Sequence, residues 1–192
     1  VGDYIVIVQE NYQILGSGSE YVSDGETLTL EFNTDSIESW PNSDNVVGVW
    51  VFLTYSEDET SSGLGCGVLS SGNPEPDTIT GAVARGELNG SASGTNDDVG
   101  HGFQVDWYDE EWVDFLWFSG LISGYTESEI EDKLDVGGVG LGDYKLDITV
   151  DVEMGGGTEC THSDDGEEVD YVIEIQTLSQ TIIPFDEFLG LL

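Results

Sequence analysis

Strict alternation of apolar and polar residues is the feature that most constrains what this chain can fold into. Between Lys145 and Met154 every even-numbered residue is apolar, and Lys145, Asp147, Thr149, Asp151 and Glu153 occupy the odd positions. A period of two places successive side chains on opposite faces of a β-strand, whereas a helix repeats every 3.6 residues. The segment is therefore predicted to be a strand with one buried face.

Similar runs predict about nine strands along the chain. They cover residues 4–9, 26–32, 46–55, 67–70, 78–87, 102–108, 112–118, 145–154 and 169–176, and a short run at 181–183 is a further candidate. We expect 145–154 and 169–176 to pair as a hairpin across the polar, glycine-rich loop 155–166. One short helix is predicted at 127–134, because Thr126 and Glu129 have the form of a capping box.

These elements predict an all-β chain that folds as one antiparallel β-sandwich over residues 1–192, with an apolar C-terminal tail at 184–192. Immunoglobulin-like and jelly-roll sandwiches share this pattern of short strands and turns. Tyr144 directly precedes the strand that begins at Lys145, as in a tyrosine corner, where the phenol bonds back to the preceding crossover. We therefore favour the immunoglobulin-like version.

The charge of the chain predicts where it works. Its 40 acidic and 3 basic residues give a formal net charge of −37 at pH 7. Such self-repulsion opposes a compact state unless salt screens it, and at about 1 M salt the screening length falls to about 3 Å. Because 38% hydrophobic and 10% aromatic content is too high for a disordered tail, we expect a folded protein in a high-salt setting.

The three basic residues, Arg85, Lys133 and Lys145, exclude two classes of partner. Binding to nucleic acid or to an anionic membrane surface needs clusters of positive charge that neutralise phosphates. We therefore expect no nucleic-acid partner and no direct binding to anionic membranes.

Three stretches carry a resemblance to a group of proteins. Residues 49–59 end a strand in an aromatic and acidic turn, and the turn Asn73-Pro74-Glu75-Pro76-Asp77 and the Gly-Ser-rich run 90–96 follow. Together, over about residues 46–110, they resemble exported β-sandwich proteins of haloarchaea. The resemblance implies an extracellular or cell-surface location, and structural proteins of haloarchaeal viruses, which are similarly acidic and β-rich, extend it to a virion.

The two cysteines, Cys66 and Cys160, are predicted to form a disulfide, since an even cysteine count in an exported β-sandwich indicates one. Two free thiols and a bond to a neighbouring subunit are the alternatives. With His162 the cysteines also offer three zinc ligands, but the paired short cysteine spacings of structural zinc sites are missing.

Calcium is a stronger candidate than zinc, and no other cofactor is expected. Hard cations take carboxylates from loops, and two acidic loops offer them. The candidate ligands are Asp164, Asp165 and Glu167 in one loop and Asp97 and Asp98 in the other. Neither loop has EF-hand spacing, so a hydrated loop without a metal is the favoured interpretation, and calcium binding is the alternative. Asn89 heads the sequon Asn-Gly-Ser and is a candidate for glycosylation.

Nothing in the sequence predicts catalysis. The only histidines are His101 and His162, and the chain has no nucleophile elbow, phosphate-binding loop or metalloprotease motif. Paired carboxylates are the signature of glycoside hydrolysis, but among 40 acids a pair in any cleft arises by chance. We expect a protein without enzyme activity.

Apolar residues at both ends, with an aromatic run between them, predict contacts with other subunits. The set comprises Tyr4, Ile5, Val6, Ile7, Val8, Trp112, Trp117, Phe185, Phe188, Leu189, Leu191 and Leu192. Each large apolar side chain left in water forfeits about 1.5–3 kcal/mol. The alternative for residues 4–8 is a central strand with both faces covered.

The predicted function is that of a non-enzymatic structural or interaction subunit of an extracellular assembly. The assembly would be a cell surface, a filament or a virion of a halophilic archaeon or its virus. A membrane-anchored or secreted ligand-binding domain is the first alternative, and a carbohydrate-active enzyme is a more distant one.

The fold is expected to require salt. When the salt concentration is lowered by dialysis to tens of millimolar, unscreened repulsion among 40 acidic residues should loosen the core and remove the near-ultraviolet circular dichroism of the aromatic residues. An unchanged spectrum through that dialysis would contradict the expectation.

Overall fold

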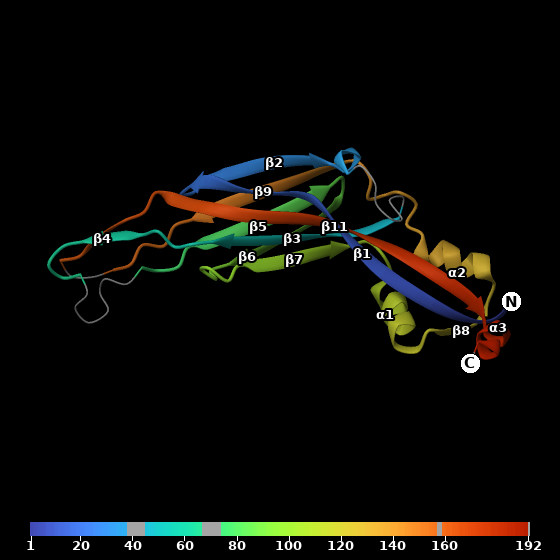
Figure 1. Ribbon diagram of the computed structural model, residues 1–192. Helices are drawn as coiled ribbons and strands as arrows, with labels where there is room; N and C mark the ends of the chain where they lie inside the picture. Colours follow the sequence, from blue (N-terminus) through green and yellow to red (C-terminus); the bar gives the residue numbers. More distant parts are fainter. Residues whose placement is uncertain (38–44, 67–73, 157–158, 192) are drawn as a thin grey trace.

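The computed structural model describes residues 1–37, 45–66, 74–156 and 159–191, and it is built mainly of antiparallel strands (Figure 1). The strands are β1 (Gly2–Ser23), β2 (Thr27–Asn33), β3 (Val46–Tyr55), β4 (Thr60–Ser62), β5 (Thr78–Arg85), β6 (Leu88–Gly94), β7 (His101–Asp106), β8 (Leu121–Tyr125), β9 (Asp143–Asp151), β10 (Thr161–Ser163) and β11 (Gly166–Pro184). The helices are α1 (Glu110–Ser119), α2 (Glu127–Leu134) and α3 (Phe185–Gly190), and a short 3-10 turn spans Thr34–Ser36. The predicted strand at 67–70 lies outside the described residues.

Two sheets make the predicted β-sandwich. One has the strand order β7-β3-β11-β1-β8 and the other has the order β2-β9-β5-β6. The antiparallel pairs are nested in the sequence: β1 pairs with β11, β2 with β9, β3 with β7, and β5 with β6. This is the connectivity of a jelly roll, in which one long hairpin of strands folds over on itself. The sandwich is confirmed, but its connectivity is that of the jelly roll and not the immunoglobulin-like one that we favoured.

The hairpin expected between residues 145–154 and 169–176 is not formed. Strand β9 pairs with β2 and β5, whereas β11 pairs with β1 and β3 in the opposite sheet. The chain between them crosses from one sheet to the other and includes β10, which pairs with β4. Alternation predicts which face of a strand is buried, but it does not predict the partner strand.

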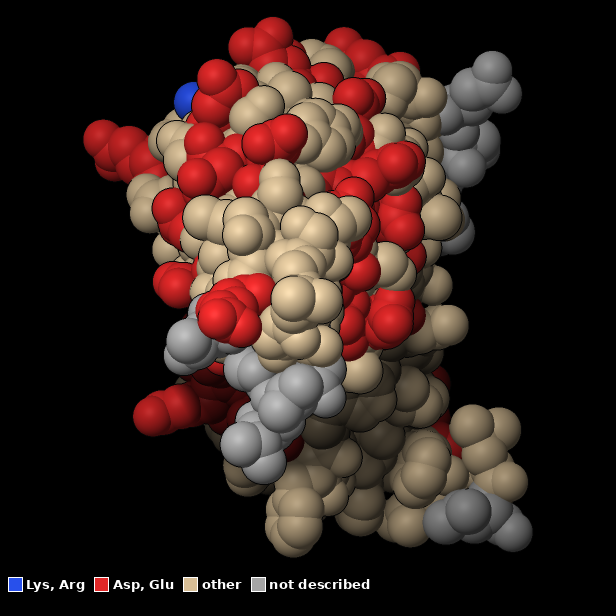
Figure 2. Space-filling view, turned by 90° about the vertical axis from the view of Figure 1, so that its left-hand side faces the viewer, with Lys and Arg blue, Asp and Glu red and all other residues tan. Residues whose placement is uncertain are grey.

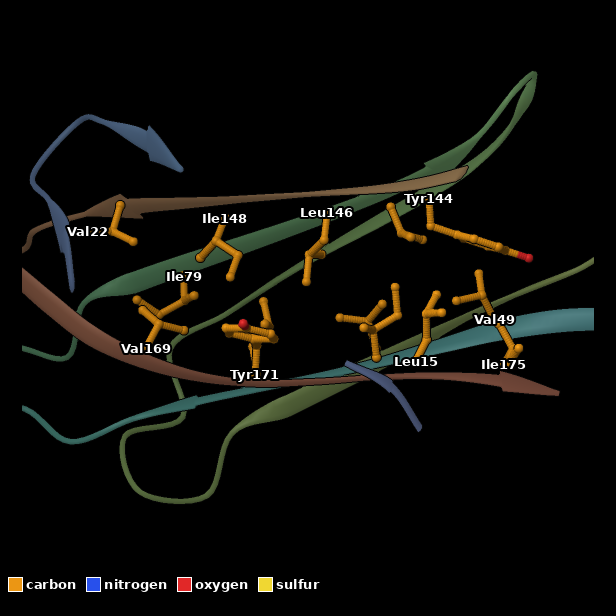
Figure 3. Packing of buried hydrophobic residues seen from close by; sticks show 14 of the residues in the cluster. Leu15, Val22, Val49, Ile79, Tyr144, Leu146, Ile148, Val169, Tyr171 and Ile175 are labelled. Atoms are coloured by element: carbon orange, nitrogen blue, oxygen red, sulfur yellow. The ribbon is translucent and has the colours of Figure 1, made fainter. Parts of the chain in front are cut away.

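The main core lies between the two sheets. Leu146 and Ile148 of β9 point toward Val169, Tyr171 and Ile175 of β11 (Figure 3). All but Tyr171 are essentially inaccessible to solvent, and Tyr171 is nearly so. The odd positions of β9 carry polar side chains that are exposed or half-buried, so the predicted strand with one buried face is confirmed from Lys145 to Asp151. Residues 152–154, which were predicted to continue it, lie beyond the end of the strand.

The tyrosine corner is present although the fold is not immunoglobulin-like. The buried phenol of Tyr144 donates a hydrogen bond to the carbonyl oxygen of Gly140 at 2.7 Å. This bond joins residues four positions apart, so it depends on the local crossover into β9 and not on the order of strands in the sheet. The motif is therefore a poor guide to connectivity.

Strands β1 and β11 continue beyond the sandwich and carry a second core. They remain paired from Tyr4 opposite Pro184 to Ser23 opposite Gly166, with one register shift between Ile14 and Gly16. At their far end the helices α1 and α2 and the strand β8 pack against them, and both chain termini lie there with α3 (Figure 1). The second core comprises Val6, Val8, Val47, Val113, Leu116, Ile122, Ile130, Leu134 and Leu178. We call this part the helical end.

Residues 112–118 were predicted as a strand, and this prediction was wrong. They belong to α1, which begins at the N-cap Asp109, whose carboxylate accepts a hydrogen bond from the backbone N–H of Trp112. The helix ends at Gly120, which has a left-handed backbone with φ of 63°. Aromatic residues favour strands, but the acidic first turn and the terminating glycine favour a helix here. The helix is also stabilised by packing, because it places Val113 and Leu116 on one buried face.

The predicted helix at 127–134 is confirmed as α2. Thr126 and Glu129 form the reciprocal capping box, and Ile130 and Leu134 are buried. The expected apolar tail from residue 184 forms the short helix α3, which contacts β1 and β11 and buries none of its described side chains fully.

Replacing Tyr144 by Phe should lower the free energy of unfolding by about 1–3 kcal/mol, because the buried carbonyl of Gly140 loses its donor. Tyr171→Phe is the matched control, since no hydrogen bond from that hydroxyl is found among the described residues. Urea unfolding in molar salt measures both variants. An equal loss in the two variants would mean that the corner bond contributes nothing specific.

Candidate functional site

Four acidic side chains converge at the end of the sandwich that lies opposite the termini. Glu57 follows β3, Asp77 directly precedes β5, Asp164 lies between β10 and β11, and Glu167 is the second residue of β11. One carboxylate oxygen from each lies within 4.8 Å of the corresponding oxygens of the others. Three loops that are far apart in the sequence thus place four carboxylates at one point, which we call the acidic cluster.

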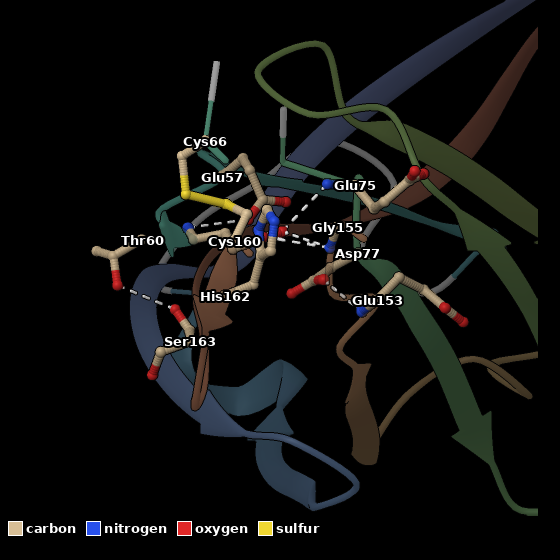
Figure 4. Close-up of polar contacts among 11 residues, drawn as sticks. Glu57, Thr60, Cys66, Glu75, Asp77, Glu153, Gly155, Cys160, His162 and Ser163 are labelled. Atoms are coloured by element: carbon tan, nitrogen blue, oxygen red, sulfur yellow. Dashed lines mark hydrogen bonds and ion pairs between the residues drawn. A yellow bond between two sulfur atoms is a disulfide. The ribbon is translucent and has the colours of Figure 1, made fainter. Parts of the chain in front are cut away.

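Backbone N–H groups hold three of these carboxylates by one oxygen each. Glu57 accepts from Glu59 at 3.0 Å, Asp77 accepts from Glu153 at 2.8 Å, and Asp164 accepts from Gly166 at 2.9 Å. Figure 4 shows Glu57 and Asp77 with these loops around them. The opposite oxygens of all three, and Oε1 of Glu167, accept no hydrogen bond from any N–H or hydroxyl group of the described residues.

The cluster holds protons more tightly than isolated carboxyl groups do. Burial, together with the charges of Glu57 and Asp58, raises the pKa of Glu167 to about 8. Burial likewise raises the pKa of Glu57 to about 7 and that of Asp77 to about 6. A protonated Glu167 can donate to the Asp77 carboxylate, so one way to neutralise the cluster is a shared proton.

A further buried carboxylate, that of Glu59, lies beside the cluster and has hydrogen-bond partners on both oxygens. Glu59 accepts hydrogen bonds from the backbone N–H groups of Gly155 and Glu75 and contacts Nδ1 of His162 (Figure 4). Burial raises the pKa of Glu59, but the two backbone donors and His162 outweigh it and lower the pKa overall. Glu59 therefore works as a structural tie between loops.

The predicted disulfide is present next to this tie. Cys66 and Cys160 are bonded, with their Cα atoms 4.9 Å apart. The zinc site considered for Cys66, Cys160 and His162 is thereby contradicted, because neither sulfur is a free thiolate and His162 pairs with Glu59.

The structure brings together only part of the predicted calcium ligands. Asp164 and Glu167 are in the acidic cluster, whereas Asp165 is exposed. Asp97 and Asp98 instead fix the neighbouring loop: Asp97 accepts from the backbone N–H of Glu57 at 2.8 Å, and Asp98 accepts from the hydroxyl of Ser56. Sequence reasoning missed Glu57 and Asp77, because their only signal is an acid at a strand boundary, which many acids here share.

Asn89 and His101, the remaining candidate residues, do not belong to the acidic cluster. Asn89 is exposed in β6 beside the turn at residues 86–87, so its sequon is accessible. His101 lies in β7, and its Nε2 atom is buried without a hydrogen-bond partner among the described residues. Among the described residues, no serine or cysteine forms a hydrogen bond with His101 that would make it a nucleophile.

The predicted interface residues gather at the helical end, where they divide into two groups. Val6 and Val8 are buried beneath the helices, and Tyr4, Ile5, Trp112, Phe185 and Phe188 are half-buried. Ile7, Trp117, Leu189 and Leu191 are exposed, and so are Phe115, Phe118 and Leu121, which were not among the predicted residues. Leu192 lies outside the described residues.

A groove runs between β1 and the end of α1. It has a volume of about 260 Å³ and is lined by Ile5–Val8 of β1 and Leu116–Gly120, none of which is charged. Beyond Val6, whose N–H donates to Gly120, the described residues place no strand on this edge of β1. We call the groove and the exposed side chains beside it (Ile7, Phe115, Trp117, Phe118 and Leu121) the apolar groove.

Asp and Glu side chains cover much of the face of the sandwich that Figure 2 shows. The helical end carries acids as well, since Glu110, Glu111 and Asp114 of α1 are exposed, but none of them lines the apolar groove. No helix in the part of the chain that the structure describes is long and apolar enough to cross a membrane.

In the presence of a chelator, stability should fall as the pH rises from about 5 to about 8. The raised pKa values of Glu57, Asp77 and Glu167 mean that the folded state holds more protons than the unfolded state in this window. Asp24, Asp58 and Asp164 add negative charge around the same groups. Urea midpoints at constant molar salt measure the slope, and Glu167→Gln should flatten it. A stability that rises over this range would contradict the prediction.

Comparisons with known proteins do not assign the chain to a family. No model of a protein family matches it, and no curated protein matches it. Similar solved structures include the VP2 subviral particle of infectious bursal disease virus (7% identity, 92% of this chain and 37% of that chain, TM-score 0.32) and the VP1 pentamer of Human Polyomavirus 7 (8% identity, 90% and 95%, TM-score 0.27). TmCBM61 in complex with β-1,4-galactotriose is also similar (9% identity, 92% and 88%, TM-score 0.28). The chain spans 37% of the length of the VP2 chain. Likenesses this weak say nothing of function, and the jelly-roll assignment rests on the strand order alone.

Proposed function

We propose that this chain is a non-enzymatic structural subunit that associates with further copies of itself through the apolar groove. The exposed aromatic side chains of that groove, in a chain of net charge −37, are the observation that carries the proposal. The jelly roll supports it only as a scaffold, because one fold serves many functions.

Charge favours a second copy as the occupant of the groove. Every copy carries the same large negative charge, so two copies repel one another wherever their acidic surfaces meet. The groove lining, Ile5–Val8 and Leu116–Gly120, contains no acidic residue. It is therefore a place where like-charged copies can approach and bury apolar area.

The side chains beside the groove offer a large gain on burial. Phe118 is 94% exposed and Trp117 is 54% exposed, so neither contributes much to the fold of the single chain. Burying a large apolar side chain is worth about 1.5–3 kcal/mol. Residues such as these, clustered with Ile7 and Leu121, are typical of interface anchors.

The open edge of β1 gives the association a geometry. From Ile7 onward this edge has backbone groups that no described strand pairs with, and unpaired edges readily add a strand from another chain. Two copies related by a two-fold axis can place their β1 edges side by side and antiparallel. The neighbouring aromatic side chains of α1 would then be covered from both sides.

The proposed setting is a high-salt exterior, either a cell surface, a filament or a virion. The acidic sandwich surface supports this setting, because such a surface stays soluble and folded when salt screens it. The disulfide between Cys66 and Cys160 supports an oxidising compartment.

A ligand-binding domain is the second candidate, and one hollow favours it. A depression of about 700 Å³ lies between the β5–β6 turn and the segment before β9, and it is lined by Arg85, Glu87, Leu88, Trp107, Val136 and Val139, with Gly86 and Gly138. Its volume is in the range of small-molecule sites. However, the Arg85 guanidinium already donates to the carbonyl of Leu141 at 2.9 Å, which reduces its availability for a ligand.

Phe118→Ser should weaken self-association at least about tenfold while the chain remains folded, since the loss of one buried aromatic exceeds 1.4 kcal/mol. Leu64→Ser is the matched control, because Leu64 is 93% exposed and lies in a loop outside the groove. Sedimentation velocity in molar salt, over a range of protein concentrations, measures both variants and the parent chain.

Two outcomes would contradict this function. The first is a parent chain that stays monomeric at every concentration, which would favour the ligand-binding candidate. The second is equal association of Phe118→Ser, Leu64→Ser and the parent, which would place any interface outside the apolar groove.

A further inference from the structure

The acidic cluster places four carboxylates together without a cationic side chain. All three basic residues are engaged elsewhere: Arg85 with the carbonyl of Leu141, Lys145 with Asp147, and Lys133 over the ring of Trp112. Neither ion pair found in the described residues includes a member of the cluster. Removing carboxylates from water without a positive partner is costly, so either bound protons or a bound cation must offset the charge of the cluster.

Two of the side chains are closed off from solvent, and each has one oxygen without a donor. Asp77 is 0% exposed and Glu167 is 1% exposed, and Oδ2 of Asp77 and Oε1 of Glu167 accept no hydrogen bond from an N–H or hydroxyl group of the described residues. Buried polar atoms of native proteins nearly always have a partner, and an ion is one of the accepted explanations when none is seen. These orphan oxygens belong to the same cluster as Glu57 and Asp164.

From this arrangement we infer that Glu57, Asp77, Asp164 and Glu167 form a binding site for a calcium ion. Two oxygens that both lie 2.3–2.6 Å from one ion are at most about 4.6–5.2 Å apart. The four oxygens lie within 4.8 Å of one another and meet this limit. The distances between the oxygens therefore satisfy the condition for sharing one ion.

Three of the carboxylates also keep one oxygen free for such an ion. In Glu57, Asp77 and Asp164 one oxygen is anchored by a backbone N–H group, and the other oxygen is the one that lacks a partner. The anchoring bonds fix the rotation of each carboxylate and leave its second oxygen available. A site arranged before the ion arrives loses little conformational freedom on binding.

The ligand set selects the kind of ion. Zinc prefers nitrogen and sulfur ligands, and this cluster offers oxygen alone. Magnesium demands near-ideal octahedral geometry and keeps several waters, whereas calcium accepts irregular sets of six to eight oxygens. Four carboxylates from three separate loops are an irregular, highly charged set, and they fit calcium best.

The ion would fasten the two sheets to each other. Glu57 and Glu167 belong to the ends of β3 and β11 in one sheet, and Asp77 belongs to the start of β5 in the other. The disulfide and the Glu59 tie join loops of the same region. The calcium site would thus close the end of the sandwich opposite the helical end.

The test uses the full chain after treatment with a chelator, in molar NaCl at constant ionic strength. Isothermal titration calorimetry with CaCl2 should show one ion bound per chain, and millimolar Ca²⁺ should raise the melting temperature. Glu167→Gln and Asp77→Asn should each lower the affinity at least about tenfold. Asp165→Asn, which removes the same charge from an exposed neighbour, should bind like the parent.

A second measurement separates a lost site from a lost fold. In the presence of the chelator, Glu167→Gln should melt at the same temperature as the parent or higher, because Gln replaces a buried carboxyl group that must either take up a proton or repel its neighbours. The same variant should show no rise in melting temperature with Ca²⁺.

Three results would overturn the inference. The first is a parent chain that shows neither heat of binding nor a shift in melting temperature with Ca²⁺. The second is an equal response of Glu167→Gln and Asp165→Asn to Ca²⁺, which would indicate general screening. The third is magnesium that binds as tightly as calcium, which would refute the assignment of the ion.

Discussion

The shortage of positive charge within the chain is the constraint on which the rest of this structure depends. Forty acidic residues face three basic ones, and each of the three is committed to a local contact. The fold therefore cannot balance its acids by internal ion pairs. It keeps most of the described acids exposed on its surface, where the medium supplies the counter-ions. Screening by the medium does not reach the acidic cluster in the same way, since Asp77 and Glu167 are buried.

The jelly roll separates the two features that matter for function. Because β1 and β11 are the first and last strands and pair along their full length, they reach from the acidic cluster at one end to the termini at the other. The sandwich core stabilises one half of this ribbon, and the helices α1 and α2 cover one face of the other half. The apolar groove and the acidic cluster thus lie on a common rigid ribbon, but at opposite ends of it.

Much of the fold could be predicted from local patterns. The alternation in β9, the capping box of α2 and the pairing of Cys66 with Cys160 each depend on signals within short stretches or on a simple count. Strand partners could not be predicted, because β9 and β11 have equally good alternation and only the three-dimensional packing decides which sheet each joins. The acidic cluster was half predicted for the same reason. Asp164 and Glu167 stand in one acidic loop, whereas Glu57 and Asp77 reach them only through the crossovers of the jelly roll.

A buried acidic cluster neutralised by a bound cation is the central claim of this account, and a crystal structure grown with calcium tests it most directly. The anomalous scattering of calcium locates the ion independently of any assumption about its ligands. We expect one strong peak, 2.3–2.6 Å from oxygens of Glu57, Asp77, Asp164 and Glu167. Peaks confined to exposed surface carboxylates, with none among these four side chains, would contradict it.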